Sequence, residues 1–165
     1  MAVATGLLRA PLHEATLEVH APPDEVWGMV ADISRMGEYS PVCRQNEWLG
    51  ELSEPVVGAR FRGHNRNGLF RWSRECVVTE AEPGRVFAFS TIFKGAESTR
   101  WRYSFAATSA GRTLITESYQ VVRVPRWIRA LWLLPGAKVK AERDHKRNMA
   151  GTLEHIKAAA EGARP

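Results

Sequence analysis

Two ionisable residues stand in strand-like segments that are otherwise rich in apolar side chains. Glu117 lies in RTLITESYQV, and Arg74 lies in FRWSRECVV, where it shares the alternation of Trp72 and Cys76. A carboxyl group enclosed by apolar side chains has a raised pKa unless a cation or hydrogen-bond donors offset the loss of water. An enclosed Glu117–Arg74 pair could serve as a general acid and base, or anchor the polar group of a ligand. The alternative is that Glu117 faces solvent and pairs across strands.

The C-terminal segment RDHKRNMAGTLEHIKAAAEG, residues 143–162, carries further ionisable groups. Its apolar residues recur at helical spacing and predict one buried stripe: Met149, Leu153, Ile156 and Ala160. Continued upstream with the same period, this stripe reaches His145 and Glu142. A helix that packs on the protein therefore carries ionisable groups along the first half of its packing face.

Motifs for metals and cofactors are absent from the sequence. Cys43 and Cys76 are far apart, form no CxxC and have no histidine at ligand spacing, so we expect neither a metal site nor a disulfide. His64, in FRGHNRNG, stands beside a turn, where a single histidine is usually solvated. GxGxxG, P-loop and GxSxG motifs do not occur, which argues against dinucleotide, nucleotide and serine-hydrolase chemistry. No cofactor is predicted.

The elements that must position these residues follow in a simple order. HEATLEVH, residues 13–20, alternates as a first strand, and residues 21–41 predict a short helix and another helical turn. Between Val42 and Val122, six strands alternate with turns, and their short connections indicate an antiparallel meander. A long helix from about Lys138 to Glu161 completes one domain of 165 residues.

Alternation also predicts which strand faces are covered. In TRWRYSFAA the aromatic residues share one face and the arginines share the other, so Trp101 and Tyr103 are expected inside. Phe87 and Phe89 are expected inside for the same reason. In the last strand, the set containing Ile115, Glu117 and Tyr119 competes with the set containing Leu114, and alternation alone does not decide between them.

The segments PPDEVWGMVADISRMGEYSP, VGARFRGHNRNGLFRWSRECVVTEAEPGRVFAFST, TRWRYSFAATSAGRTLITESYQ and NMAGTLEHIKA together resemble the polyketide cyclase/dehydrase and lipid transport branch of the START and Bet v 1-like superfamily, also called SRPBCC. The resemblance spans about residues 14–160. It implies an α+β helix-grip fold, in which a seven-stranded curved antiparallel sheet wraps around a long C-terminal helix and two short helices follow the first strand. It also favours Ile115, Glu117 and Tyr119 as the inward-facing set.

This resemblance implies that the domain binds a small hydrophobic molecule, lipid-, sterol- or polyketide-like, in a cavity between the sheet and the C-terminal helix. Glu142 and His145 would then roof the cavity, or else lie in solvent at its rim. The ligand-binding residues expected are Trp72, Phe87, Phe89, Trp101, Tyr103, Ile115, Tyr119, Glu142 and Met149. The alternative is a cyclase or dehydratase in which Glu117 and Arg74 act as acid and base, with His145 as a further base.

The remaining expectations concern partners and location. The net charge of +5 permits an acidic partner without requiring one, and the Arg- and aromatic-rich stretch at residues 60–74 is assigned to the meander, so no nucleic-acid partner is predicted. The segment from Trp127 to Trp132, flanked by arginines and lysines, is either a lid on the cavity or a site of transient membrane contact. Without a signal sequence or a long apolar run, the protein is predicted to be cytoplasmic.

Overall fold

A single antiparallel sheet forms most of the protein. The computed structural model describes residues 12–109, 111–123, 130 and 133–162. The strands described are β1 (Leu12–Val19), β2 (Cys43–Leu49), β3 (Arg60–Asn67), β4 (Phe70–Glu82), β5 (Val86–Phe93), β6 (Ala96–Ser109) and β7 (Arg112–Val121). Their order in the sheet is β1-β7-β6-β5-β4-β3-β2, so every neighbouring pair except β1 and β7 is consecutive in the chain. The predicted meander of six strands, extended by the first strand, is confirmed.

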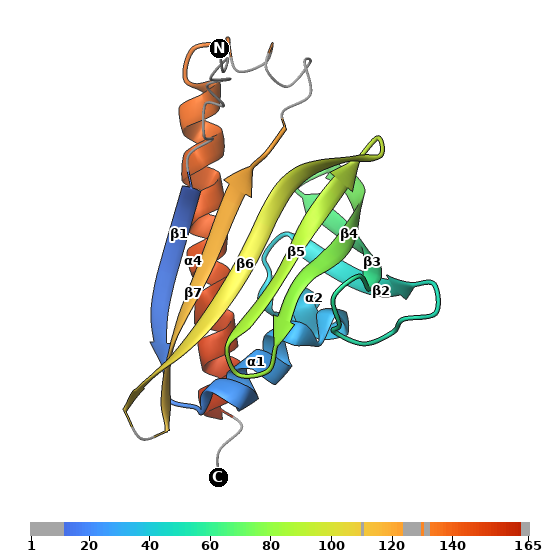
Figure 1. Cartoon of the computed structure of the whole chain (residues 1–165). Helices are drawn as coiled ribbons and strands as arrows, with labels where there is room; N and C mark the ends of the chain where they lie inside the picture. Colours follow the sequence, from blue (N-terminus) through green and yellow to red (C-terminus); the bar gives the residue numbers. More distant parts are fainter. Residues whose placement is uncertain (1–11, 110, 124–129, 131–132, 163–165) are drawn as a thin grey trace, which may run out of the picture.

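Within the described ranges, four helical segments accompany the sheet. Between β1 and β2 lie α1 (Pro23–Ala31), the 3-10 helix η1 (Ile33–Arg35) and α2 (Met36–Tyr39), and the long helix α4 (Ala137–Gly162) follows β7. Figure 1 shows α4 running lengthwise behind β1 and β7 on one side of the curved sheet, with α1 beside its C-terminal end. The helix-grip fold predicted from the sequence is therefore confirmed, including the two short helices after the first strand.

The start of α1 follows from its sequence. Pro22 is extended and Pro23 occupies the first helical position, where its missing N–H costs nothing and its fixed φ suits a helix. Asp24 and Glu25 place carboxylates in the first turn, close to the positive end of the helix dipole. This helix presents Val26 and Val30 to the interior, where both are fully buried.

The packed part of the core lies at the end of the sheet where α1 meets α4. The predicted stripe on α4 is confirmed, since Met149, Leu153, Ile156 and Ala160 are each at most 1% exposed. Aromatic and aliphatic side chains of the sheet meet the helices there, including Phe87, Phe105 and Ile115. Removing such side chains from water is the main stabilising contribution, roughly 1.5–3 kcal/mol for each.

Polar contacts hold the helices to the sheet. The Trp27 indole N–H donates to the Val86 carbonyl oxygen at 2.9 Å, which ties α1 to β5. The Lys157 ammonium donates to the Glu18 carbonyl oxygen at 2.9 Å, which ties α4 to β1. His155 Nδ1 lies 2.7 Å from the carbonyl oxygen of Tyr39, so α4 also contacts the end of α2. The contacts of Lys157 and His155 hold α4 against β1 and α2.

Candidate ligand-binding site

Glu117 lies in the interior, on the concave face of β7. It is 2% exposed and is the direct cross-strand partner of Tyr103 on β6. The Tyr103 hydroxyl donates a hydrogen bond of 2.7 Å to Glu117 Oε1, whereas Oε2 is buried without a partner among the described residues. The inward-facing alternative for β7 is thus confirmed, because Thr113 and Ile115 are also buried and Leu114 is 37% exposed.

Burial determines the protonation of this pair. Loss of water raises the pKa of Glu117 to about 8, while the Tyr103 hydrogen bond acts in the opposite direction. Burial and the neighbouring carboxyl group raise the pKa of Tyr103 well above its usual value. Near pH 7, Glu117 is therefore mainly a neutral acid. Its Oε2 hydroxyl can donate a hydrogen bond to an acceptor inside the protein.

Aromatic rings continue the concave face on both sides of this pair. The Trp101 and Tyr119 rings have centroids 4.6 Å apart, and the Phe89 ring lies 6.4 Å from Trp101. Across the sheet towards β2, Phe61 lies 5.2 Å from Phe89 and Trp48 lies 5.8 Å from Phe61. Rings from five strands, β2, β3, β5, β6 and β7, therefore form a largely apolar wall with Glu117 and Tyr103 set into it.

His145 approaches this wall from α4. The centroid of its ring lies 3.8 Å from that of Tyr119 and 5.2 Å from that of Trp101, and the His13 ring of β1 is 6.4 Å away. His145 Nε2 is buried without a partner among the described residues. Burial, and secondarily the proximity of His13, lower the pKa of His145 to about 4. At neutral pH this imidazole is uncharged and can accept a proton or a hydrogen bond.

Arg74 is not brought to Glu117. Its Nη1 donates to the Ser73 carbonyl oxygen at 2.9 Å, and its guanidinium carbon lies 4.9 Å from the centroid of the Phe93 ring. Among the described residues, no ion pair joins Arg74 and Glu117. The reason is topological, since β6 and β5 separate β7 from β4, and three strand spacings amount to roughly 14 Å.

Other predicted site residues lie away from Glu117 or in the packed core. Glu142 is half-buried on α4, 3.9 Å from Lys138 in an i,i+4 ion pair. Trp72 is half-buried and stacks on Phe70 at 5.3 Å, near the β3–β4 hairpin. Phe87 and Ile115 are fully buried, as is Met149 on the packed half of α4. Apart from Ala130, the segment from Trp127 to Trp132 lies outside the described residues.

Two interior polar residues were not singled out from the sequence. His13 is on the concave face of β1, directly opposite Tyr119 in the β1–β7 register. Its position two residues before Ala15, on the same face of the strand, could have indicated this. Tyr39 is 1% exposed, and its hydroxyl has no partner among the described residues. Tyr39 follows a helical turn whose exact phase the sequence does not define, so no simple pattern indicated its burial.

Both cysteines lie in the interior near β2 and β4. Burial raises the pKa of Cys43 to about 11 and that of Cys76 to about 12, so both are thiols at neutral pH. Cys43 Sγ contacts Asn46 Oδ1 at 3.3 Å, and the Asn46 amide donates to the Ile33 carbonyl oxygen at 2.8 Å. Among the described residues, no cluster of three or more His, Cys, Asp or Glu side chains is placed to hold a metal ion.

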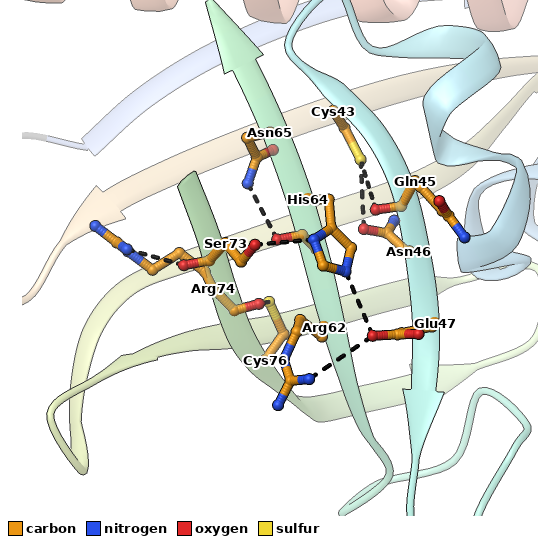
Figure 2. Close-up of polar contacts among 11 residues, drawn as sticks. Cys43, Gln45, Asn46, Glu47, Arg62, His64, Asn65, Ser73, Arg74 and Cys76 are labelled. Carbon is orange, nitrogen blue, oxygen red and sulfur yellow. Dashed lines mark hydrogen bonds and ion pairs between the residues drawn. The ribbon is translucent and has the colours of Figure 1, made fainter. Parts of the chain in front are cut away.

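His64 belongs to a row of polar side chains on the convex face (Figure 2). His64 Nδ1 lies 2.8 Å from Ser73 Oγ, and its Nε2 lies 3.3 Å from Glu47 Oε1. Glu47 Oε1 also forms an ion pair with Arg62 at 3.7 Å. The His64 and Glu47 side chains are 42% and 48% exposed. Because His64 alternates with the buried Phe61 and Gly63, this row lies on the opposite face of the sheet from Glu117.

A second feature of the convex face is a half-open hollow of about 380 Å³ over β4, β5 and β6. Its floor includes the small residues Ala88 and Ser90. Ion pairs stand beside it, from Arg102 to Glu80 at 3.0 Å and from Arg100 to Glu97 at 2.6 Å. The charged groups bordering this hollow are therefore already neutralised by one another.

Comparison with known proteins agrees with this fold. Residues 13–161 match the family described as polyketide cyclase / dehydrase and lipid transport. The chain belongs to this family. No curated protein matches the chain. Within the described residues, no helix combines the length and apolar character needed to cross a membrane.

Solved structures share the fold over nearly the whole chain. The Zhui aromatase/cyclase from Streptomyces sp. R1128 is 20% identical with a TM-score of 0.71, and the match covers 92% of this chain and 93% of that one. The Polyketide_cyc-like protein Cgl2372 from Corynebacterium glutamicum is 31% identical with a TM-score of 0.59, covering 94% of both chains. The di-domain ARO/CYC StfQ from the steffimycin biosynthetic pathway is 17% identical with a TM-score of 0.72, covering 93% of this chain and 51% of that one.

Proposed function

We propose that the protein binds a small, neutral, hydrophobic molecule of the lipid, sterol or polyketide type between the concave face of the sheet and α4. The observation that carries this proposal is Glu117, a carboxyl group 2% exposed, set in a wall of aromatic rings and hydrogen-bonded to Tyr103. No cation is among the groups that shift its pKa. A protonated carboxyl group donates to a carbonyl or ether oxygen, whereas a ligand carboxylate near it would lack a counterion.

The aromatic wall supports the same class of ligand. Rings such as Phe89, Trp101 and Tyr119 contact flat or elongated apolar molecules over large areas, and a few polar groups among them fix the orientation. Two further buried polar atoms, His145 Nε2 and the Tyr39 hydroxyl oxygen, lack partners among the described residues. A bound molecule with two or more oxygen atoms beside Tyr119 would satisfy both Glu117 Oε2 and His145 Nε2.

The test is to purify the protein from its own host, record native mass spectra and identify extracted small molecules. The expected result is a stoichiometric neutral ligand that is lipid-, sterol- or polyketide-like. Rebinding of that ligand to Glu117→Gln should weaken by no more than about tenfold, since the amide keeps both a donor and an acceptor. A strictly anionic or highly polar ligand would contradict the proposal.

A second candidate function is a cyclase or dehydratase, and the separation of the two pKa values favours it. Glu117 is a neutral acid near pH 7 and His145 is a neutral base, and both border the Tyr119 region of the interior. In a dehydration, the Glu117 carboxyl group would give its proton to the departing hydroxyl group, which leaves as water. His145 or the resulting carboxylate would take the proton α to the carbonyl, and the new carbon–carbon double bond forms.

Glu117→Gln separates the two functions. An enzyme of this kind should lose at least about 100-fold in kcat while retaining its ligand, because general acid–base catalysis contributes roughly 10²–10⁴. A binding protein should show no turnover in either form. Arg74→Gln provides a matched comparison, because Arg74 belongs to β4 and does not contact Glu117 among the described residues. Equal loss of turnover in both variants would argue against Glu117 as the acid.

A further inference from the structure

The β3–β4 hairpin exposes apolar side chains at its tip, here defined as residues 66–71. Asn67 and Phe70 form the last cross-strand pair, so Gly68 and Leu69 make a two-residue loop. Leu69 is 96% exposed and Phe70 is 66% exposed. A single exposed apolar side chain is common on soluble proteins, but two adjacent ones at the apex of a hairpin form a projecting apolar point.

The hairpin tip extends beyond the end of β5. Pairing between β4 and β5 begins only at Glu75 and Ile92, and β5 ends at Phe93. The first five residues of β4 therefore pair with β3 alone, which corresponds to a two-stranded ribbon of about 17 Å. Over this length the tip is therefore free of β5.

The charges around the tip are positive. From Asn65 to Arg74 the chain contains Arg66, Arg71 and Arg74 and no Asp or Glu. Arg66 Nε donates to the Gly68 carbonyl oxygen at 2.8 Å and stiffens the turn, while Arg71 is exposed. The neighbouring β5–β6 hairpin adds Lys94, whose ammonium lies 5.9 Å from the centroid of the Phe93 ring. Apolar tips with adjacent cations are complementary to an anionic lipid surface.

The turn before α4 and its first helical turn have the same character at the same end of the molecule. The chain directions place the β3–β4 hairpin, the β5–β6 hairpin, the end of β7 and the start of α4 at one end of the sheet, the upper end in Figure 1. Leu133, Leu134 and Val139 are 85%, 58% and 67% exposed. Lys138 and Lys140 lie among them, each paired with an acidic residue one turn on.

We propose that this end of the domain, led by Leu69 and Phe70, docks on the surface of a membrane that contains anionic lipids. The most exposed residue is aliphatic and sits at a turn, which suits insertion among acyl chains better than stacking on nucleic-acid bases. The proposal goes beyond ligand binding, because it concerns a surface outside the aromatic wall. Phe70 and Trp72 lie on the same face of β4 as the buried Cys76 and Val78, so the tip continues the concave face on which the proposed ligand would lie.

The experiment measures partition of the full-length protein to vesicles of phosphatidylcholine with and without phosphatidylglycerol. Leu69→Asp should weaken partition to the anionic vesicles by about tenfold or more, because it removes a leucine from the acyl region and adds a negative charge. Arg71→Glu should have a similar effect at low salt and little effect in high salt. Both residues are exposed, and thermal unfolding of each variant verifies that the fold is unchanged.

Matched controls lie at the other end of the sheet. Val57→Asp alters an apolar side chain that is 64% exposed before β3, and Arg85→Glu alters an exposed arginine in the β4–β5 turn. Both should leave partition unchanged. Four results would overturn the proposal: no partition of the wild type, equal weakening by Leu69→Asp and Val57→Asp, binding only to a single-stranded oligonucleotide, or a Leu69-dependent dimer that does not bind vesicles.

Discussion

Tyr103 and Glu117 face each other across the β6–β7 ladder, and the Tyr103 hydroxyl donates a 2.7 Å hydrogen bond to the Glu117 carboxyl group. This is a buried hydrogen bond between two side chains that each resist ionisation because of burial. The pair therefore places a proton donor, rather than a charge, inside an aromatic wall. That arrangement suits recognition of an uncharged oxygen-containing group.

Tyr103→Phe should raise the pKa of Glu117 above its value of about 8, since the Tyr103 hydrogen bond lowers it. The free energy of unfolding should fall by about 1–2 kcal/mol through loss of a buried hydrogen bond. Carboxyl-carbon NMR titration and urea unfolding measure the two effects. Tyr119→Phe is the control, because the Tyr119 hydroxyl makes no hydrogen bond to Glu117 among the described residues. An unchanged Glu117 titration in Tyr103→Phe would contradict the assigned hydrogen bond.

Glu117 should make the protein less stable as the pH rises. The pKa of Glu117 is about 8 in the folded protein, against a reference value of 4.5. Between pH 4.5 and pH 8, therefore, the folded state keeps a proton that the unfolded state has lost. Stability attributable to this group is present below pH 4.5 and is lost as the pH rises to 8, by up to about 1.4 kcal/mol per pH unit. Glu117→Gln should remove this slope in urea unfolding measured across the window. Glu154→Gln, at an exposed position on α4, should preserve it.

The contribution of His145 to stability should depend on pH in the opposite direction. Its pKa of about 4, against 6.5 as the reference, means that the unfolded state binds a proton more readily. The folded state should therefore lose stability as the pH falls from 6.5 to 4. The imidazole resonances of His145 should titrate near pH 4 by NMR. In His145→Phe, the free energy of unfolding should fall less steeply between pH 6.5 and 4. A midpoint near 6.5 would show that the ring is not enclosed by Tyr119 and Trp101.

Gly37 should tolerate no side chain, because a Cβ there would collide with the carbonyl oxygen of Arg44 on β2. The Arg44 atoms that such a Cβ would meet belong to the backbone and cannot rotate away, so the clash is relieved only if α2 moves away from the sheet. Gly37→Ala should lower the free energy of unfolding by about 1–3 kcal/mol. Gly28→Ala is the matched control on α1, where a Cβ meets nothing within 4 Å, and it should stabilise by about 0.5–1 kcal/mol. Equal effects in chemical unfolding would refute the close approach of α2 and β2.

Local patterns were sufficient to predict most of the fold. Alternation in β6 and spacing in α4 identified Tyr103, Met149 and Leu153 as inward-facing, and all three are buried. These patterns work because one face of each element is covered, so that burial follows the backbone period. The start of α1 was similarly evident from its prolines and acidic residues.

Which of the predicted site residues lie close together in space was harder to predict from the sequence. Alternation indicated that Arg74 and Glu117 share a sheet face, but face alone says nothing of their separation, and the meander places β5 and β6 between them. Register shifts between Val78 and Glu80 and between Thr91 and Ile92 further interrupt alternation along β4 and β5. The His64–Ser73 contact, in contrast, follows from the two-residue loop Gly68–Leu69, which sets the β3–β4 register.

The pairing of β1 with β7 has a consequence for biosynthesis. Leu12 is the partner of Gln120, and Lys157 binds the carbonyl oxygen of Glu18 across a separation of 139 residues. β1 therefore has no partner in the sheet until β7 has been synthesised, whereas β2 to β6 can pair as they emerge. High contact order of this kind slows folding. A nascent chain that ends before α4 leaves the aromatic wall uncovered, because His145 of α4 lies against Trp101 and Tyr119.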